Sequence, residues 1–109
     1  MADLTHQFEV DGSSAHLTLS GEIDMRVAPQ LRAVLHEILQ KSPDELIVDL
    51  ADVPFIDSSG IATLVEALRL QMNANRKLRI QNAVEQVFYT FKITQLTEAF
   101  GMQDPGEAS

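Results

Sequence analysis

Apolar and polar residues alternate in two short segments near the start of the chain. Phe8 and Val10 alternate with polar residues, and Leu17 and Leu19 do the same after the segment Asp11-Gly12-Ser13-Ser14. A period of two is typical of strands, and a glycine between two such segments favours a tight turn. The pattern therefore predicts an antiparallel β-hairpin.

The rest of the chain changes to apolar residues spaced three and four apart, which is the period of an amphipathic helix. Pro29 fits the first turn of the first such segment, where its missing N–H costs little. The apolar faces are Val27, Leu31, Val34, Leu35, Ile38 and Leu39 for the first helix, Ile61, Leu64, Val65, Leu68 and Met72 for the second, and Val84, Val87, Phe88 and Phe91 for the third. Leu96, Ala99 and Phe100 predict a short fourth helix.

Two more strands are predicted between these helices. The apolar run in residues 45–50 is typical of a strand covered on both faces, and Leu78 and Ile80 alternate in a shorter one. Strands alternating with helices require right-handed crossovers and a mostly parallel sheet. The predicted fold is α/β: a small mixed sheet with an antiparallel N-terminal hairpin, packed by about four helices. We expect one domain over residues 1–109, with an ordered core at about 7–102 and a loose tail at 103–109.

Composition narrows the possible partners. The 109 residues include 8 Lys and Arg against 16 Asp and Glu, for a net charge of −8. Nucleic-acid binding and anionic membrane surfaces both favour clustered basic residues, so neither is expected as a partner. The chain has no cysteine, and we find no signal peptide and no apolar run of bilayer length. We expect a cytoplasmic protein without direct membrane insertion, and a monomer.

The sequence carries no recognisable catalytic apparatus. His6, His16 and His36 fall in polar positions without metal-ligand spacing, and we interpret each as a solvated surface residue. Ser58 and Ser59 have no Gly-x-Ser-x-Gly context, and Gly60 belongs to no nucleotide-binding fingerprint. We therefore predict no catalytic residues, no metal, no cofactor and no enzymatic activity.

The segment Asp57-Ser58-Ser59-Gly60 carries the most information about function. It lies between the central strand and the second helix, at the sheet edge where α/β proteins place functional loops. Two interpretations compete. Asp57 or Ser58 can simply cap the helix that follows. Alternatively, Ser59 accepts a phosphate, which unpaired N–H groups and the helix dipole would stabilise at a helix start while charging the surface.

At these residues the chain resembles STAS domains, and among them the bacterial anti-sigma factor antagonists. The resemblance rests on residues 57–60, on Gly21-Glu22-Ile23-Asp24 before the first helix, and on the strand 46–50 ending nine residues before Ser59. It extends from about Phe8 to Phe100. Two departures are the loop 81–83, which lacks Gly and Pro, and the aromatic run 88–91; both leave the identity of the partner open.

The resemblance implies partner switching. An unphosphorylated antagonist binds an anti-sigma factor that is also a serine kinase with a histidine-kinase-like ATPase fold, and so releases the sigma factor or another regulator. The kinase phosphorylates the second serine of the motif, here Ser59, with Ser58 as the alternative site, and a metal-dependent serine phosphatase resets the cycle. The implied partner-binding residues are Glu22, Asp24, Asp57, Ser58, Ser59 and Gly60. Helix or turn capping remains the alternative for Asp24, Asp57 and Ser58.

Two other functions stay open at this point. One is a STAS subunit of a membrane lipid-transport ATPase complex, and the other is a scaffold in a stress-signalling assembly. The intact motif around Ser59 favours the antagonist.

Overall fold

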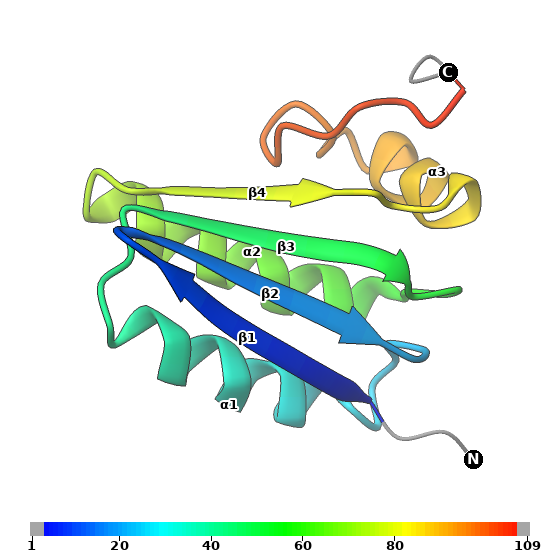
Figure 1. Ribbon diagram of the computed structural model, residues 1–109. Coiled ribbons are helices and arrows are strands. Elements are labelled where there is room, and N and C mark those ends of the chain that lie inside the picture. The colour runs from blue at the N-terminus through cyan, green and yellow to red at the C-terminus, as the bar shows by residue number, and fades with distance from the viewer. Residues whose placement is uncertain (1–3, 107–109) are drawn as a thin grey trace.

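The computed structural model describes residues 4–106, which form one four-stranded sheet and three helices (Figure 1). The elements follow one another as β1 (Thr5–Asp11), β2 (Ser14–Ser20), α1 (Ala28–Leu39), β3 (Glu45–Asp52), α2 (Ser58–Asn73), β4 (Lys77–Gln81) and α3 (Glu85–Ile93).

The strands lie in the order β1-β2-β3-β4. β1 and β2 pair antiparallel. The turn between them contains Gly12, whose φ of 63° is one that glycine adopts readily. β2–β3 and β3–β4 pair parallel, and the helical crossovers α1 and α2 make this possible. The predicted mixed sheet with its antiparallel hairpin is confirmed.

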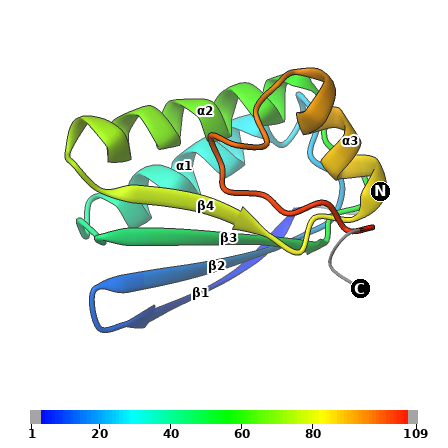
Figure 2. The same ribbon diagram turned by 90° about the horizontal axis from the view of Figure 1, so that it is seen from above.

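Both long helices cover the same face of the sheet, as Figure 2 shows. The expectation that residues 45–50 are covered on both faces is therefore wrong. Leu46, Val48 and Leu50 face the helices, whereas Ile47 lies on the open face in the row His16–Ile47–Arg79. Ile47 is nevertheless buried, so the run is apolar because one residue of the open face is enclosed by its neighbours.

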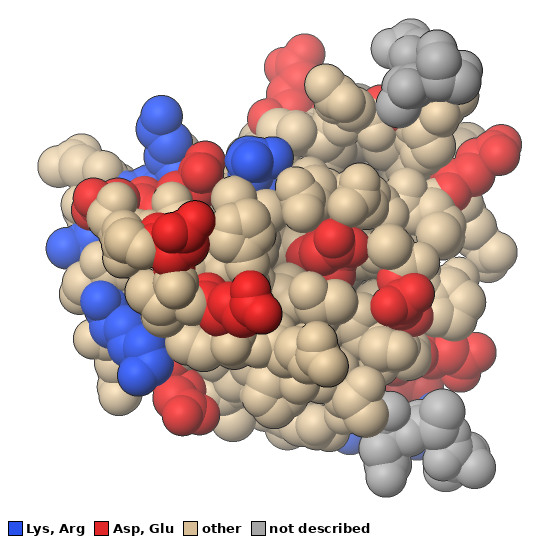
Figure 3. Space-filling model, in the orientation of Figure 1, with Lys and Arg blue, Asp and Glu red and all other residues tan. Residues whose placement is uncertain are grey.

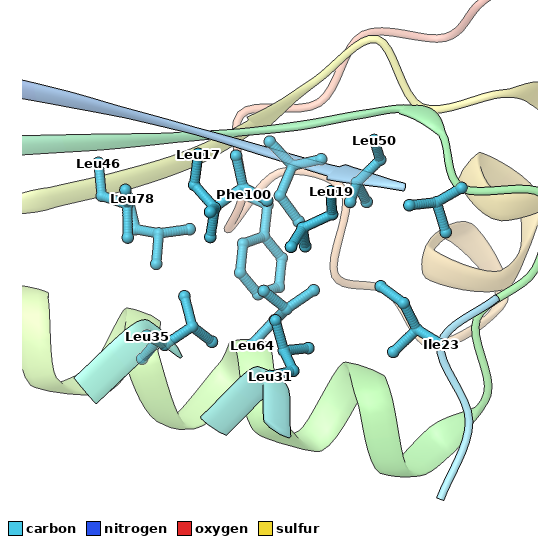
Figure 4. Packing of buried hydrophobic residues seen from close by; sticks show 14 of the residues in the cluster. Leu17, Leu19, Ile23, Leu31, Leu35, Leu46, Leu50, Leu64, Leu78 and Phe100 are labelled. Carbon is cyan, nitrogen blue, oxygen red and sulfur yellow. The ribbon is translucent and has the colours of Figure 1, made fainter. Parts of the chain in front are cut away.

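The core lies between the sheet and the two helices and consists of large aliphatic side chains (Figure 4). Phe91 and Phe100 add a pair of rings whose centroids lie 5.5 Å apart. Their edge-to-face arrangement is one that aromatic pairs favour. The apolar faces predicted for the first three helices are buried or half-buried apart from one position: Met72 is 62% exposed, and its neighbour Gln71 is buried.

The predicted fourth helix is absent. Residues 97–101 form turns in which the Phe100 N–H donates to the Leu96 carbonyl and the Gly101 N–H to the Glu98 carbonyl. Gly101 takes a positive φ, which ends helical geometry after one turn. The chain then passes the edge of β4, where the Ile80 N–H donates to the Phe100 carbonyl.

The ends of the described chain differ in part from expectation. Leu4 is buried and its carbonyl accepts a hydrogen bond from the Gln30 amide, so ordered structure begins before residue 7. His6, which precedes the predicted ordered core, belongs to β1. In the predicted tail the Gly106 N–H donates to Asp104, and residues 107–109 lie outside the described part.

Candidate functional site

Two loops at the carboxyl ends of β2 and β3 are joined by backbone hydrogen bonds. The Ile23 N–H donates to the Phe55 carbonyl at 2.9 Å, and the Asp57 N–H donates to the Ile23 carbonyl at 3.0 Å. These bonds form a parallel bridge between Ile23 and Ile56. The segments 21–24 and 57–60, which are far apart in sequence, therefore lie side by side at the helix-start end of the molecule.

Asp57 is the N-cap of α2. Its Oδ1 atom accepts hydrogen bonds from the Ser59 N–H at 3.0 Å, the Gly60 N–H at 3.1 Å and the Ser59 hydroxyl at 2.6 Å. Desolvation raises the pKa of this carboxyl, but the bonds from Ser59, from Gly60 and from the Met25 backbone together bring the pKa below its usual value. Asp57 is thus a carboxylate at neutral pH, and it links the helix start to the neighbouring loop.

The two serines of the motif occupy different positions. Ser58 is the first residue of α2 and is exposed, whereas Ser59 is half-buried and its hydroxyl points to Asp57. Ser59 also lines an open groove between α1 and α2 whose other walls include Met25, Ala28, Ala33 and Ala62. The cap is therefore Asp57, one of the two residues predicted for it.

Gly60 is buried under the bridge between the two loops. A Cβ atom at this position would lie 2.5 Å from Cγ2 of Ile23 and 2.8 Å from Cγ1 of Ile56. The absence of a side chain therefore lets α2 start directly against both loops.

Asp24 does not cap α1, whose N-cap is Val27 without a side-chain bond. The Oδ2 atom of Asp24 pairs with Arg26, at 2.7 Å from Nη2 and 3.0 Å from Nε. The Oδ1 atom of Asp24 accepts a hydrogen bond from the Arg26 backbone N–H. The hydrogen bonds from Arg26 are the largest cause of a lowered pKa at Asp24. Asp24 is thus a turn residue with a fixed carboxylate, and Glu22 beside it is exposed.

Two exposed apolar side chains flank this site and were not among the predicted residues. Met25 is 74% exposed and Phe55 is 40% exposed. Each belongs to one of the two joined loops. The sequence signal for them was an apolar residue inside a loop, since neither fits the period of a neighbouring helix or strand. Exposed apolar side chains next to polar groups are typical of interaction surfaces.

An ion-pair cluster connects α1 to α2 further from the serines. Glu66 accepts from His36 Nε2 at 3.0 Å and from Arg32 Nε at 3.1 Å, and these contacts lower its pKa, with the His36 hydrogen bond as the largest cause. His36 was predicted as a solvated residue, and it is exposed as well as paired. His16 lies on the open sheet face, as expected.

The charged groups are unevenly distributed along the molecule. On the face seen in Figure 3, most basic side chains lie toward the end of the molecule away from the joined loops, where acidic side chains accompany them, whereas the charged side chains toward the loops are mostly acidic. Among residues 4–106 no cluster of three metal-ligating side chains occurs, and within the same residues no helix is both long and apolar enough to cross a membrane.

Curated proteins with similar sequences are anti-sigma factor antagonists. An anti-sigma-B factor antagonist from Bacillus subtilis is 29% identical over 91 residues, which span 84% of this chain and 83% of the relative. One from Listeria monocytogenes is 28% identical over 90 residues, 83% of this chain and 79% of the relative.

Solved structures are similar at lower identity. An anti-sigma factor antagonist from Mycobacterium paratuberculosis superposes with a TM-score of 0.84 at 24% identity, over 94% of this chain and 86% of the other. The phosphorylated Bacillus cell fate determinant SpoIIAA superposes with a TM-score of 0.71 at 22% identity, over 95% of this chain and 96% of the other. The STAS domain family model matches residues 6–106, and the chain therefore belongs to the STAS domain family.

Proposed function

We propose that this protein is an anti-sigma factor antagonist that works by partner switching. The observation that carries the proposal is the Ser59 hydroxyl, which Asp57 holds at the start of α2 in a groove that exposed Met25 also lines. Curated relatives named anti-sigma-B factor antagonists support the same function. In its unphosphorylated form the protein binds an anti-sigma factor and so frees the sigma factor or another regulator.

The proposed partner surface is the end of the molecule where the two loops meet. Ser58, Ser59, Glu22 and Asp24 supply its polar part, and Met25 its apolar part. Asp57 and Gly60 contribute to this surface indirectly, because they shape the loop that carries it. Gly60 is buried, and the Asp57 side chain bonds to the start of α2. An acidic rim favours a partner with a basic face.

The proposed switch is phosphorylation of Ser59 by a partner that is both anti-sigma factor and serine kinase. A phosphate adds about −1.5 to −2 charges next to the Asp57 carboxylate and inside the contact area. A hundredfold loss of affinity requires about 2.7 kcal/mol. Repulsion and desolvation of a dianion at an interface can supply that amount. A metal-dependent serine phosphatase would restore the binding form.

A pull-down from the native cytoplasm with wild type, Ser59→Ala and Ser59→Asp tests the proposal. We expect wild type and Ser59→Ala to recover a kinase of the histidine-kinase-like ATPase type, and Ser59→Asp to lose it. Ser13→Ala, which changes an exposed serine in the turn between β1 and β2, is the matched control and should behave as wild type. Recovery of a transporter ATPase with all variants would instead support the lipid-transport subunit and contradict the antagonist.

A further inference from the structure

We propose that Asp57 is a positioning residue for phosphoryl transfer: its Oδ1 atom holds the Ser59 hydroxyl in one orientation and thereby selects Ser59 over Ser58 as the acceptor. This inference rests on the proposed function, because it concerns the same serine. It goes further in assigning a reason, within this chain, why the less exposed of two adjacent serines accepts the phosphate.

The geometry around Oδ1 carries the first step. The Ser59 hydroxyl lies 2.6 Å from Oδ1, which is the short distance typical of an O–H donor and a carboxylate. The N–H groups of Ser59 and Gly60 fix the same oxygen at 3.0 and 3.1 Å. The helix backbone therefore immobilises Oδ1 of Asp57, and the Ser59 hydroxyl has one defined hydrogen-bond partner.

The direction of that bond is the second step. A hydroxyl that donates its proton toward Asp57 turns its oxygen lone pairs away from the carboxylate. The lone pairs are the nucleophile in phosphoryl transfer, and catalysis of this reaction depends largely on positioning and charge stabilisation. Ser58 is exposed at the first helical position, and within residues 4–106 no comparable bond holds its hydroxyl.

The chemical step balances with a nucleoside triphosphate as the donor. Oγ of Ser59 forms a bond to the γ-phosphorus, the bond from that phosphorus to the β,γ-bridging oxygen breaks, and the nucleoside diphosphate leaves. The Oγ proton stays in its hydrogen bond to Asp57 until the new bond to phosphorus makes it acidic, and it then leaves to water or to a base of the kinase. Asp57 is not assigned as that base, because three donors on Oδ1 stabilise its ionised form and make it a weak proton acceptor.

The first test needs no kinase. Three-bond couplings between Hα and Hβ of Ser59, measured by NMR, report whether its side chain occupies one rotamer. We expect a single rotamer in wild type and in Asp57→Asn, whose amide oxygen can still accept the bond, and averaging in Asp57→Ala. Averaged couplings in wild type would overturn the inference.

The second test uses the kinase recovered by pull-down, with ATP and Mg²⁺, and locates the phosphate by mass spectrometry. We expect Asp57→Ala to lower the rate constant for phosphorylation of Ser59, measured with this protein at a saturating concentration, by about tenfold or more. The fraction of phosphate found on Ser58 should rise. Asp57→Asn should stay within about threefold of wild type, with an unchanged pH profile. If Asp57→Ala and Asp57→Asn slow phosphorylation of Ser59 equally, Asp57 acts through its charge and not by positioning the hydroxyl, and the inference is wrong.

Thr63→Val is the matched control for a loosened helix start. Thr63 donates to the Ser59 carbonyl at 2.8 Å in the same turn, whereas the Ser59 hydroxyl bonds to Asp57 and not to Thr63. It should lower stability without changing the Ser58 to Ser59 ratio. A ratio that shifts equally in Thr63→Val would assign the effect to helix fraying and contradict the proposal. If wild type itself is not phosphorylated, the proposed function fails, whatever the couplings show.

Discussion

At the scale of single residues, Gly60 sets how closely α2 approaches the two site loops. Its neighbours are the side chains of Ile23 and Ile56, which form the bridge between the loops. Because Gly60 is helical and not at a positive φ, backbone freedom does not explain the glycine; close packing does. The residue thus couples the position of Ser59 to that of Asp24.

Gly60→Ala should destabilise the protein by about 1–2 kcal/mol. Overpacking a close contact costs about 1–3 kcal/mol, and the better helix propensity of alanine returns up to about 1 kcal/mol. Urea unfolding followed by circular dichroism measures the difference. Ser58→Ala changes an exposed side chain of the same helix start. This control should stay within about 0.5 kcal/mol of wild type. A Gly60→Ala variant as stable as wild type would show that the isoleucines relax freely.

Individual site residues could be predicted from sequence to different degrees. The cap at Asp57 follows from a local rule, since its oxygen reaches N–H groups two and three residues ahead. The Asp24–Arg26 pair was not predicted, because two residues outside a helix meet only when the loop takes a particular shape. The adjacency of the two loops likewise depends on tertiary backbone bonds, and only the family resemblance suggested it.

At the scale of elements, the end of α2 depends on a polar side chain. Gln71 is buried, and its amide nitrogen donates to the carbonyls of Lys77 at 2.8 Å and Pro43 at 3.1 Å. These carbonyls belong to the start of β4 and the loop before β3. One side chain therefore ties the carboxyl end of α2 to the starts of two neighbouring strands.

Gln71→Leu should cost about 1–3 kcal/mol of stability, because two carbonyls in the protein interior lose their donor. Met72→Gln is the matched control, because Met72 is the adjacent residue and is exposed. This control should change stability by less than about 0.5 kcal/mol. Thermal and urea unfolding both measure the effect. Equal stability of Gln71→Leu and wild type would mean that water reaches both carbonyls.

The elements that local patterns describe were predicted well, and those that depend on tertiary context were not. The hairpin and three helices follow from the strand and helix periods of apolar residues. The turn around Phe100 has helical spacing, but the positive φ of Gly101 and the contact with Phe91 end it. Gln71 is buried in place of Met72, because a glutamine whose amide has two hydrogen-bond partners in the interior can take the place of an apolar residue.

At the scale of the whole molecule, two carboxylates with lowered pKa values lie in the site loops and a third lies in the contact between α1 and α2. Asp24 is held by Arg26, Asp57 by the start of α2 and Glu66 by His36 and Arg32. Asp57 and Glu66 connect segments that are distant in the sequence, whereas Asp24 stabilises its own loop. Carboxylates with lowered pKa values thus stabilise both the site loops and the α1–α2 contact, and acid should weaken both.

The stability of the protein should fall in acid. Each of the three native pKa values lies below the ordinary value of 3.8 for Asp or 4.5 for Glu, so the unfolded chain binds more protons in this range. The stabilisation is therefore present above pH 4.5 and is lost as the pH falls through the native values.

Urea unfolding between pH 7 and pH 3 measures this loss of stability. The triple variant Asp24→Asn, Asp57→Asn, Glu66→Gln should show a shallower decline below pH 4.5 than wild type, because it lacks the carboxyl groups that bind protons on unfolding. Parallel slopes for the triple variant and wild type would place the acid sensitivity elsewhere in the molecule.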